Sequence, residues 1–352
     1  MGSPRQRLLL GLILAATIAG AVANYAGAPD VLSFVLSAIA LAGLAWVVSA
    51  ATESVGRRFG PGVTGVLQAS LGNLPELFVV LFALRAGQVV VAQTSILGSL
   101  FATALLIMGL VILAGARVAD DGVMRFHRRL PQDTGTLLLL AVFIIVLLSL
   151  SVGSADPASG HRQVISNIGA VLLIAVYAIW LFGYLRSDTA AGVAEGDEEA
   201  GFTFPVALTL LAVGGVGAAL VSDWFVTALG PSLETLHLSE AFAGIVIVAI
   251  AGNAVEHVAG VVLASKGKSD LAVSVVKNSV SQIALFLYPA LVLLSLLFDT
   301  HLTFVLAPVY VGALGITALA LWQITSDGEA YAFEGWGLIS LYVIVAVFAY
   351  FE

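Results

Sequence analysis

The sequence contains no cysteine and few charged residues. Only 10% of its 352 residues are charged, whereas 60% are apolar. The lack of cysteine excludes disulfide bonds, thiolate metal sites and thiol-based catalysis. The scarcity of charge, together with apolar runs of roughly 18 or more residues from end to end, is typical of membrane-spanning helices and argues against a water-soluble globular protein.

The apolar runs, divided at polar or Gly/Pro-marked breaks, predict an all-α polytopic membrane protein with about eleven transmembrane helices. The first run follows Arg5 and Arg7 and continues without a small-residue cleavage site, so we expect it to be retained. The predicted spans lie near residues 8–26, 31–52, 63–84, 88–114, 135–152, 164–185, 204–228, 239–264, 270–297, 302–323 and 333–351.

The basic residues predict the orientation of these spans, because cytoplasmic segments of membrane proteins carry an excess of lysine and arginine. With a cytoplasmic N-terminus, only Arg85 and Arg162 lie outside, and Lys277 falls within a span. The acidic linker at 186–203 then lies in the cytoplasm. Its acids are Glu195, Asp197, Glu198 and Glu199. The basic residues on the cytoplasmic side are Arg5, Arg7, Arg57, Arg58, Arg117, Arg125, Arg128, Arg129, Arg186, Lys266 and Lys268.

The chain contains an internal repeat, which is seen when it is shifted against itself so that Gly72 aligns with Gly252. The two copies begin at the third and eighth predicted spans, so they cross the membrane in opposite directions. Inverted repeats with interrupted helices at matching places indicate a secondary transporter whose site lies near the bilayer midplane. The other pairs matched by this one shift are Asn73 and Asn253, Glu76 and Glu256, Gly87 and Gly267, Ala92 and Ala272, Ser99 and Ser279, Ala104 and Ala284, and Leu105 and Leu285.

Each copy places one glutamate, Glu76 or Glu256, inside an apolar span. An ionised carboxylate at the membrane centre costs several kcal/mol, so each should face a wet cavity, a cation or a proton rather than lipid. The bland alternative is a structural acid that is hydrogen-bonded between helices. Recurrence at matched positions of inverted repeats favours the ion-binding interpretation.

Helix breakers precede both glutamates. Pro75 lacks an amide donor and Gly72 relaxes the backbone, which would free carbonyl groups near 70–72 as cation ligands. The second copy has Val255 in place of the proline, so its break depends on Gly252 and the asparagine that follows it.

The helices that follow the two signatures carry further oxygen donors. Carboxylate, amide, hydroxyl and carbonyl oxygens without sulfur form a hard-ligand set that suits Ca²⁺, Mn²⁺ or Na⁺. The same carboxylates can hold protons, because desolvation and a like-charged neighbour raise carboxyl pKa values. Because the same carboxylates would bind either a cation or protons, the sequence predicts a protein that exchanges a cation for protons. The donors are Gln93, Ser95, Ser99 and Thr103 in one copy and Ser274, Asn278, Ser281 and Gln282 in the other.

The stretches GNLPELFVVLFALRAG and GNAVEHVAGVVLASKGKSDLAV resemble the paired signature repeats of the cation/proton exchangers (CAX branch) of the calcium/cation antiporter superfamily. The resemblance covers nearly the whole chain, including the acidic linker. It implies an extra first helix at 1–30, a five-helix repeat at 31–185 with its signature at 68–106, the linker, and an inverted five-helix repeat at 204–352 with its signature at 248–286. The segments ATES at 51–54, LVSDWFV at 220–226, SQIALF at 281–286, and SDGE and FEG within 326–335 also resemble that family.

The resemblance also implies roles for single residues. Family members exchange cytosolic Ca²⁺ for protons, so Ca²⁺ is a transported substrate and no cofactor is expected. Glu76 and Glu256 would be the alternately exposed residues that bind Ca²⁺ or protons, with Asn73 and Asn253 beside them. Glu53 and Asp223 would line the access routes, and His257 matches a family histidine.

Two neighbouring residues depart from the family pattern. Relatives usually carry an apolar residue and then glycine where this chain has Lys277 and Asn278. An ammonium near the glutamates would replace one cation, alter the stoichiometry or lower the affinity for Ca²⁺. Gln68 and Thr103, which stand where asparagine is common, are milder oxygen-donor changes.

Most of these residues also have a bland interpretation. The two asparagines would satisfy broken backbone, the histidine would be a packed donor instead of a proton relay, and the lysine would extend its ammonium towards the surface. Acids near span ends are often solvated or capping. Serines and glutamines, including Ser279 and Gln282, would hydrogen-bond between helices, and the linker would be a soluble tether instead of a cation sensor.

We therefore predict a Ca²⁺/H⁺ antiporter that works by alternating access. The alternatives are exchange of Na⁺, K⁺ or Mn²⁺ for H⁺, and a passive cation channel. The chain has no HExxH pair and no Gly-rich phosphate loop, so we do not expect an enzyme. We expect an integral protein of a prokaryotic cell membrane with no nucleic-acid partner. A homo-oligomer is possible, and the sequence leaves the oligomeric state open.

Overall fold

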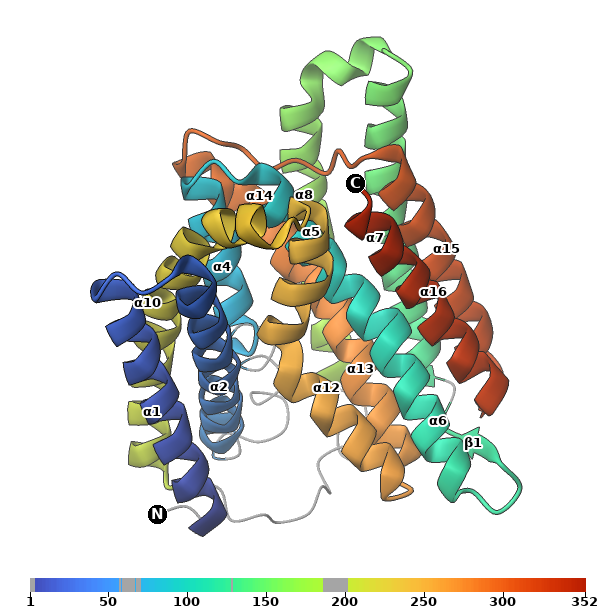
Figure 1. Ribbon diagram of the computed structural model, residues 1–352. Helices are drawn as coiled ribbons and strands as arrows, with labels where there is room; N and C mark the ends of the chain where they lie inside the picture. The colour runs from blue at the N-terminus through green and yellow to red at the C-terminus, as the bar shows by residue number, and fades with distance from the viewer. Residues whose placement is uncertain (1–3, 57, 59–66, 68–70, 128, 186–201) are drawn as a thin grey trace.

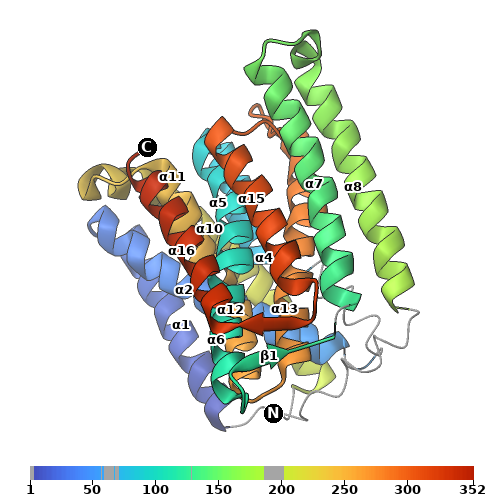
Figure 2. The ribbon, with the colours of Figure 1, turned by 90° about the vertical axis from the view of Figure 1, so that its right-hand side faces the viewer.

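The computed structural model describes residues 4–56, 58, 67, 71–127, 129–185 and 202–352, apart from the side chains of residues 5, 129–132, 184–185 and 255–256. Its helices run in both directions between two ends of the molecule (Figure 1). The first helix starts at one end and the last helix finishes at the other (Figure 1, Figure 2), which is the arrangement that the predicted eleven spans require.

Helices dominate because a chain in lipid must satisfy its backbone donors and acceptors internally. The elements of the first half are α1 (Pro4–Tyr25), α2 (Asp30–Gly56), α4 (Leu74–Arg85), α5 (Val89–Phe101), the π-helical η1 (Ala102–Ile107), α6 (Met108–Val118), β1 (Val123–Arg125), α7 (Arg129–Gly153), the 3₁₀ turn η2 (Pro157–His161) and α8 (Arg162–Leu185).

The second half follows the plan of α2 to α8, but its first helix is longer and its strand precedes the last helix. Its elements are α10 (Phe204–Leu236), α11 (Glu240–Phe242), the π-helical η3 (Ala243–Val248), α12 (Ala249–Ser265), α13 (Ser269–Gln282), the π-helical η4 (Ile283–Leu287), α14 (Tyr288–Leu294), the 3₁₀ turn η5 (Ser295–Leu297), α15 (Pro308–Thr325), β2 (Glu329–Tyr331) and α16 (Ala332–Tyr350).

The described part of the chain confirms ten of the eleven predicted spans. Nine helices are long and apolar enough to cross a membrane, and a bent pair, Glu240–Ala254 with His257–Ser265, brings the number to ten. The predicted span near 63–84 is described only from residue 71 onwards, apart from residue 67, and its described part contains α4.

Two predicted boundaries are wrong. The span placed at 302–323 begins at Pro308, because residues 301–307 run outside any helix and proline starts the helix at a position where no amide donor is needed. The span placed at 204–228 continues through Pro231 to Leu236. The longer helix places Asp223 well inside α10, rather than near its end.

The non-helical segment at 301–307 is held by side chains from three other elements. The hydroxyls of Ser295, Ser166 and Ser149 accept hydrogen bonds from the backbone amides of Leu302 (2.8 Å), Phe304 (3.2 Å) and Leu306 (3.0 Å), respectively. Protein groups thus satisfy the backbone amides of this non-helical segment, as they must wherever lipid rather than water surrounds the chain.

The two halves interleave. The helix α2 packs against α10, α7 against α15, and α6 against α16. Figure 2 shows α7 and α8 along one edge and α1 and α2 along the other, with the signature helices between them. Most buried apolar side chains of both halves form one continuous core, and Val55, Phe202 and Ala207 form a second, small cluster.

A small sheet joins the halves at one end. The strands β1 and β2 pair antiparallel, with Val123 opposite Tyr331 and Arg125 opposite Glu329. The guanidinium of Arg125 contacts the carboxylates of Asp121 (2.7 Å) and Glu329 (3.2 Å). The hydrogen bond from Arg125 lowers the pKa of the Asp121 carboxyl.

Candidate functional site

The two signature stretches meet inside the helix bundle. A Cβ atom placed on Gly252 would lie 3.7 Å from the Cβ of Glu76, which is ordinary van der Waals contact. Glu76 is 1% exposed. The predicted partners, which belong to different halves of the sequence, therefore lie side by side.

The first signature breaks its helix where the sequence predicts. Gly72 and Asn73 form a turn, and α4 starts at Leu74 with Pro75 in its first turn. Glu76 also lies in that first turn. Unsatisfied amides at a helix N-terminus favour negative charge, so this position stabilises the carboxylate.

The second signature bends without a proline. The axes of Glu240–Ala254 and His257–Ser265 differ by 65°, so the break expected near Gly252 and Asn253 is present. The side chain of Glu256 itself lies outside the described residues. Its backbone belongs to α12, at the position that matches Glu76.

The asparagines of the two copies have different surroundings. The Nδ2 of Asn253 donates to the Oγ of Ser99 at 2.8 Å and to the carbonyl of Ala249 at 3.1 Å. In the other copy, the buried Nδ2 of Asn73 and Oγ of Ser279 have no hydrogen-bond partner among the residues that the structure describes.

A close backbone contact joins α5 to η3, and the sequence reasoning missed it. A Cβ on Gly98 would lie 2.5 Å from the Cα of Ile245 and 2.8 Å from the carbonyl oxygen of Gly244. Only a glycine allows this approach. The signal was the pair of glycines in otherwise bulky helices, which indicates contact only once the helices are known to face each other.

Both signature regions continue into a π-helical segment at matched positions. When the two copies of the repeat are aligned, η1 (Ala102–Ile107) and η4 (Ile283–Leu287) nearly coincide. Short π-helical stretches are frequent at functional sites. Within η1, the hydroxyl of Thr103 lies 3.4 Å from Nε2 of His257, so this histidine contacts the opposite copy.

The helix α13 carries an unusual number of buried polar groups. Lys277 is 0% exposed and Asn278 is half-buried, with no described partner for its Oδ1. Ser274 and Ser281 are buried on the same helix. Lys277 is therefore enclosed in the bundle, on a helix that packs directly against α12.

Other predicted residues are placed elsewhere in the bundle. The Nε2 of Gln93 donates to the carbonyl of Val305 at 3.1 Å, which holds the extended segment, and Gln282 lies within hydrogen-bonding range of Tyr177. Glu53 on α2 and Asp223 on α10 are exposed. The linker acids Glu195, Asp197, Glu198 and Glu199 lie outside the described residues.

The donors described at the signatures are hard oxygen ligands. Among the side chains that the structure describes, no three acids and histidines gather into one group. The arrangement instead combines the Glu76 carboxylate with asparagine amides, serine hydroxyls and a helix break. Ca²⁺ accepts such mixed sets, completed by carbonyls and water.

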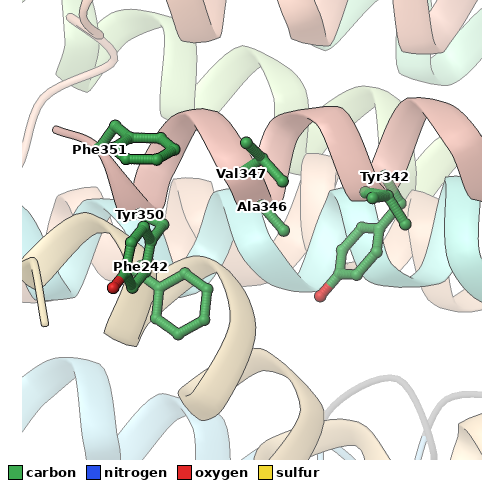
Figure 3. A pocket seen from close by; sticks show the side chains of 7 residues that line it. Phe242, Tyr342, Ala346, Val347, Tyr350 and Phe351 are labelled. Atoms are coloured by element: carbon green, nitrogen blue, oxygen red, sulfur yellow. The ribbon is translucent and has the colours of Figure 1, made fainter.

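An apolar pocket lies away from the signatures, between α11 and the end of α16 (Figure 3). Phe242 meets Tyr350 edge to face there, with ring centroids 5.6 Å apart. Aromatic and aliphatic side chains dominate its lining, so the pocket lacks the ligands a cation needs. The lining residues are Phe242, Tyr342, Val343, Ala346, Val347, Tyr350 and Phe351.

Comparison with known proteins identifies the class. The model of the sodium/calcium exchanger protein family matches residues 30–185 and 206–351. The chain therefore belongs to the sodium/calcium exchanger protein family, and it is an integral membrane protein of the exchanger fold.

Particular relatives narrow the comparison. The chain is 30% identical over 326 residues to the Ca²⁺/H⁺ antiporter ChaA of Bacillus subtilis, covering 91% of this chain and 92% of that protein. It is 30% identical over 368 residues to the Ca²⁺/H⁺ antiporter of Synechocystis, covering 99% of each.

Solved structures confirm the fold. Native YfkE superposes with a TM-score of 0.82 at 27% identity, covering 98% of this chain and 100% of that one. The H⁺/Ca²⁺ exchanger CAX, at 16% identity, shows the fold alone, with a TM-score of 0.75 and coverage of 99% and 93%.

Proposed function

We propose that the protein is a secondary active antiporter that exchanges Ca²⁺ for H⁺ by alternating access and exports Ca²⁺ from the cytosol. The observation that carries this proposal is the closeness of Glu76 in one inverted signature to the backbone of Gly252 in the other. The Ca²⁺/H⁺ antiporters that are 30% identical to this chain support the choice of ions.

Coupling follows from the chemistry of the carboxylates. When Glu76 and Glu256 are ionised, their charge compensates a divalent cation, and when the cation leaves, desolvation favours protonation of both. Because the same oxygens serve both ions, the cation and the protons exclude each other. This competition makes exchange possible without a separate proton site.

The neighbouring groups complete this picture. Asn73, Asn253 and the backbone at Gly72 and Gly252 would supply neutral oxygens around the cation. The acids Glu53 and Asp223 would line the routes of access, and His257 would adjust the second signature through its contact with Thr103. The residues that would surround these ligands or line the ion pathway are Ser99, Ser279, Gln93, Gln282, Lys277 and Asn278.

The proposed setting is the cell membrane of a prokaryote, with the N-terminus and the 186–203 linker in the cytoplasm. The amide of His127 donates to Asp270 at 2.6 Å, so Arg125 and Lys268, both counted as cytoplasmic, belong to segments at one end of the molecule. In the cysteine-free chain, impermeant thiol reagents should label Ser154→Cys only from outside and Ser265→Cys only from inside; the reverse would overturn this orientation.

The function is tested in liposomes loaded with a pH dye, across which a Ca²⁺ gradient is imposed. We expect counter-directed proton movement that both Glu76→Gln and Glu256→Gln abolish. Glu234→Gln, an exposed acid at the end of α10, is the matched control and should transport normally. Proton movement that survives in both signature variants would overturn the proposed site.

The same liposomes separate the alternatives. If Na⁺, K⁺ or Mn²⁺ drives protons and Ca²⁺ does not, the exchanger mechanism holds with another ion, and Lys277 and Asn278 are the first residues to examine. Cation flux that needs no counter-ion gradient would identify a passive channel. Size measurement in detergent tests for a homo-oligomer.

A further inference from the structure

The two signature asparagines are related by the repeat, but among the described residues only Asn253 forms a hydrogen bond with the opposite copy. Asn253 donates to Ser99, and both side chains are buried, at 3% and 0% exposed. The alignment of the two copies converts this pair into Asn73 and Ser279. These two are buried as well, and no described residue bonds to the Asn73 amide or to the Ser279 hydroxyl.

A buried polar group without a partner costs free energy, so a second arrangement that satisfies it is expected to exist. In a protein built from inverted repeats, the opposite state of the cycle is obtained when the two copies exchange conformations. That exchange would form the bond between Asn73 and Ser279 and break the bond between Asn253 and Ser99.

The bond that is present lies next to a closed contact. Gly98 precedes Ser99 on α5 and meets the backbone of Ile245 in η3, while Asn253 follows on the same bent span. The hydrogen bond therefore lies beside the tight contact between α5 and η3. Opening that contact would separate the two side chains.

The bond also fixes what the asparagine offers to an ion. Both N–H groups of the Asn253 carboxamide are used, one on Ser99 and one on Ala249. The carboxamide is thus held in one orientation, and its oxygen is the atom that can act as a ligand, one helical turn before Glu256. Asn73 has no such restraint on its amide among the described residues.

We propose that Ser99 and Ser279 are positioning residues, each of which holds the asparagine of the opposite signature in one of the two transport states. This inference rests on the proposed alternating access. It assigns the present structure to the state in which the Ser99 bond is made and the Ser279 bond is broken. The two serines thus act in opposite directions on one equilibrium.

The lack of cysteine makes the test direct. Thr94 is 4% exposed beneath η3, so in Thr94→Cys a thiol reagent reacts only when α5 and η3 separate. Labelling is measured in nanodiscs, where both faces are accessible. We expect Ser99→Ala to raise the labelling rate and Ser279→Ala to lower it, each by about fivefold, the effect of one hydrogen bond of ordinary strength.

Controls separate this role from general packing. Ser95 is buried on α5 but donates only to the carbonyl of Val91 within its own helix (2.6 Å), so Ser95→Ala should leave the rate unchanged. Ser99→Thr and Ser279→Thr keep the hydroxyl group, so their labelling rates should equal the rate of the Thr94→Cys parent. Hydrogen exchange of residues 89–101, measured in chains that retain Thr94, gives the same comparison without the reporter.

Shifts of the same sign in both alanine variants, or no shift in either, would overturn the proposal. Labelling and exchange need no transported ion, so they separate this inference from the proposed function. If the labelling rates shift in opposite directions but no Ca²⁺/H⁺ flux is measured, the serines position the asparagines in a transporter of another ion. Normal flux without shifts would reject the serine pair alone.

Discussion

The two copies of the repeat differ in chemistry on their second helices. In the first copy, Leu97, Gly98 and Ser99 present an apolar side chain, a backbone contact and a bonded hydroxyl. In the second, the matching residues are Lys277, Asn278 and Ser279. The same topology therefore supports a close backbone contact at Gly98 in one copy and a buried lysine in the other. Duplication preserved the backbone plan while the chemistry of the copies diverged.

The largest expected effect comes from breaking the backbone contact at Gly98, on the second helix of the first copy. Gly98→Ala places a methyl group 2.5 Å from the Cα of Ile245, where only backbone movement can relieve the clash. We expect transport to fall by roughly tenfold or more and the thermal midpoint to drop, because overpacking against backbone is costly.

The matched control is another helical glycine. Gly312 in α15 has open space where its Cβ would be, so Gly312→Ala should leave transport unchanged and keep or slightly raise the thermal midpoint. Equal losses in the two variants would show that the effect reflects helix propensity, not the contact between α5 and η3.

The next largest effect is expected from replacing Lys277, which is a buried basic residue that the second copy has and the first copy lacks at the matching position. Lys277→Leu gives the second copy the residue found at the matching position of the first. Removing an enclosed ammonium beside the cation site should lower the half-saturating Ca²⁺ concentration by roughly threefold or more, since like charges repel strongly at low dielectric. The charge moved per cycle should change too, which current recordings on supported membranes measure.

Lys277→Arg serves as the control for this change. It retains a positive charge and should keep the charge per cycle of the parent protein, even if transport slows. A leucine variant with unchanged affinity and unchanged currents would contradict a role for Lys277 at the site.

A third comparison concerns the two ends of the molecule. The repeat shift maps β1 onto residues 303–305, which form no strand. One end uses paired strands, whereas at the other end the hydroxyl of Ser149 accepts from the amide of Leu306. Ser149→Ala leaves that buried amide without its acceptor and should destabilise the protein by about 1–3 kcal/mol. Ser154→Ala, at an exposed serine, should not shift thermal unfolding measurably.

The smallest expected effect is at the paired strands. Arg125→Gln removes exposed ion pairs to Asp121 and Glu329, which salt and water screen. Because the native pKa of Asp121 is lowered, this contribution is present above the ordinary pKa of aspartate and is lost as the pH falls through the lowered value. In acid, the thermal midpoint of the variant should therefore equal that of the parent protein. At neutral pH, the variant should unfold at a slightly lower temperature than the parent.

Much of the fold could be predicted from the sequence because its signals are local. Runs of apolar residues gave ten spans that the described helices confirm, and the glycine, asparagine and glutamate coincidences gave the repeat. The meeting of Glu76 with Gly252 followed from that repeat.

Other features depend on partners that are distant in the sequence. Residues 301–307 read as apolar and helical, but serines from three other elements hold them extended. The interhelical role of Gln93 and the glycine contact between α5 and η3 likewise exist only once helices are packed. No periodicity within one segment encodes such pairings.

The interleaving of the halves has a consequence for biosynthesis. The helices α2, α6 and α7 find their main partners in α10, α16 and α15, which are synthesised later. During insertion, we therefore expect the first half to enter the bilayer before these partners exist, with Glu76, Asn73 and Ser99 not yet covered by the second half. We expect this intermediate to be the stage at which chaperones and membrane proteases act, and a chain arrested before α10 to be degraded rather than stored.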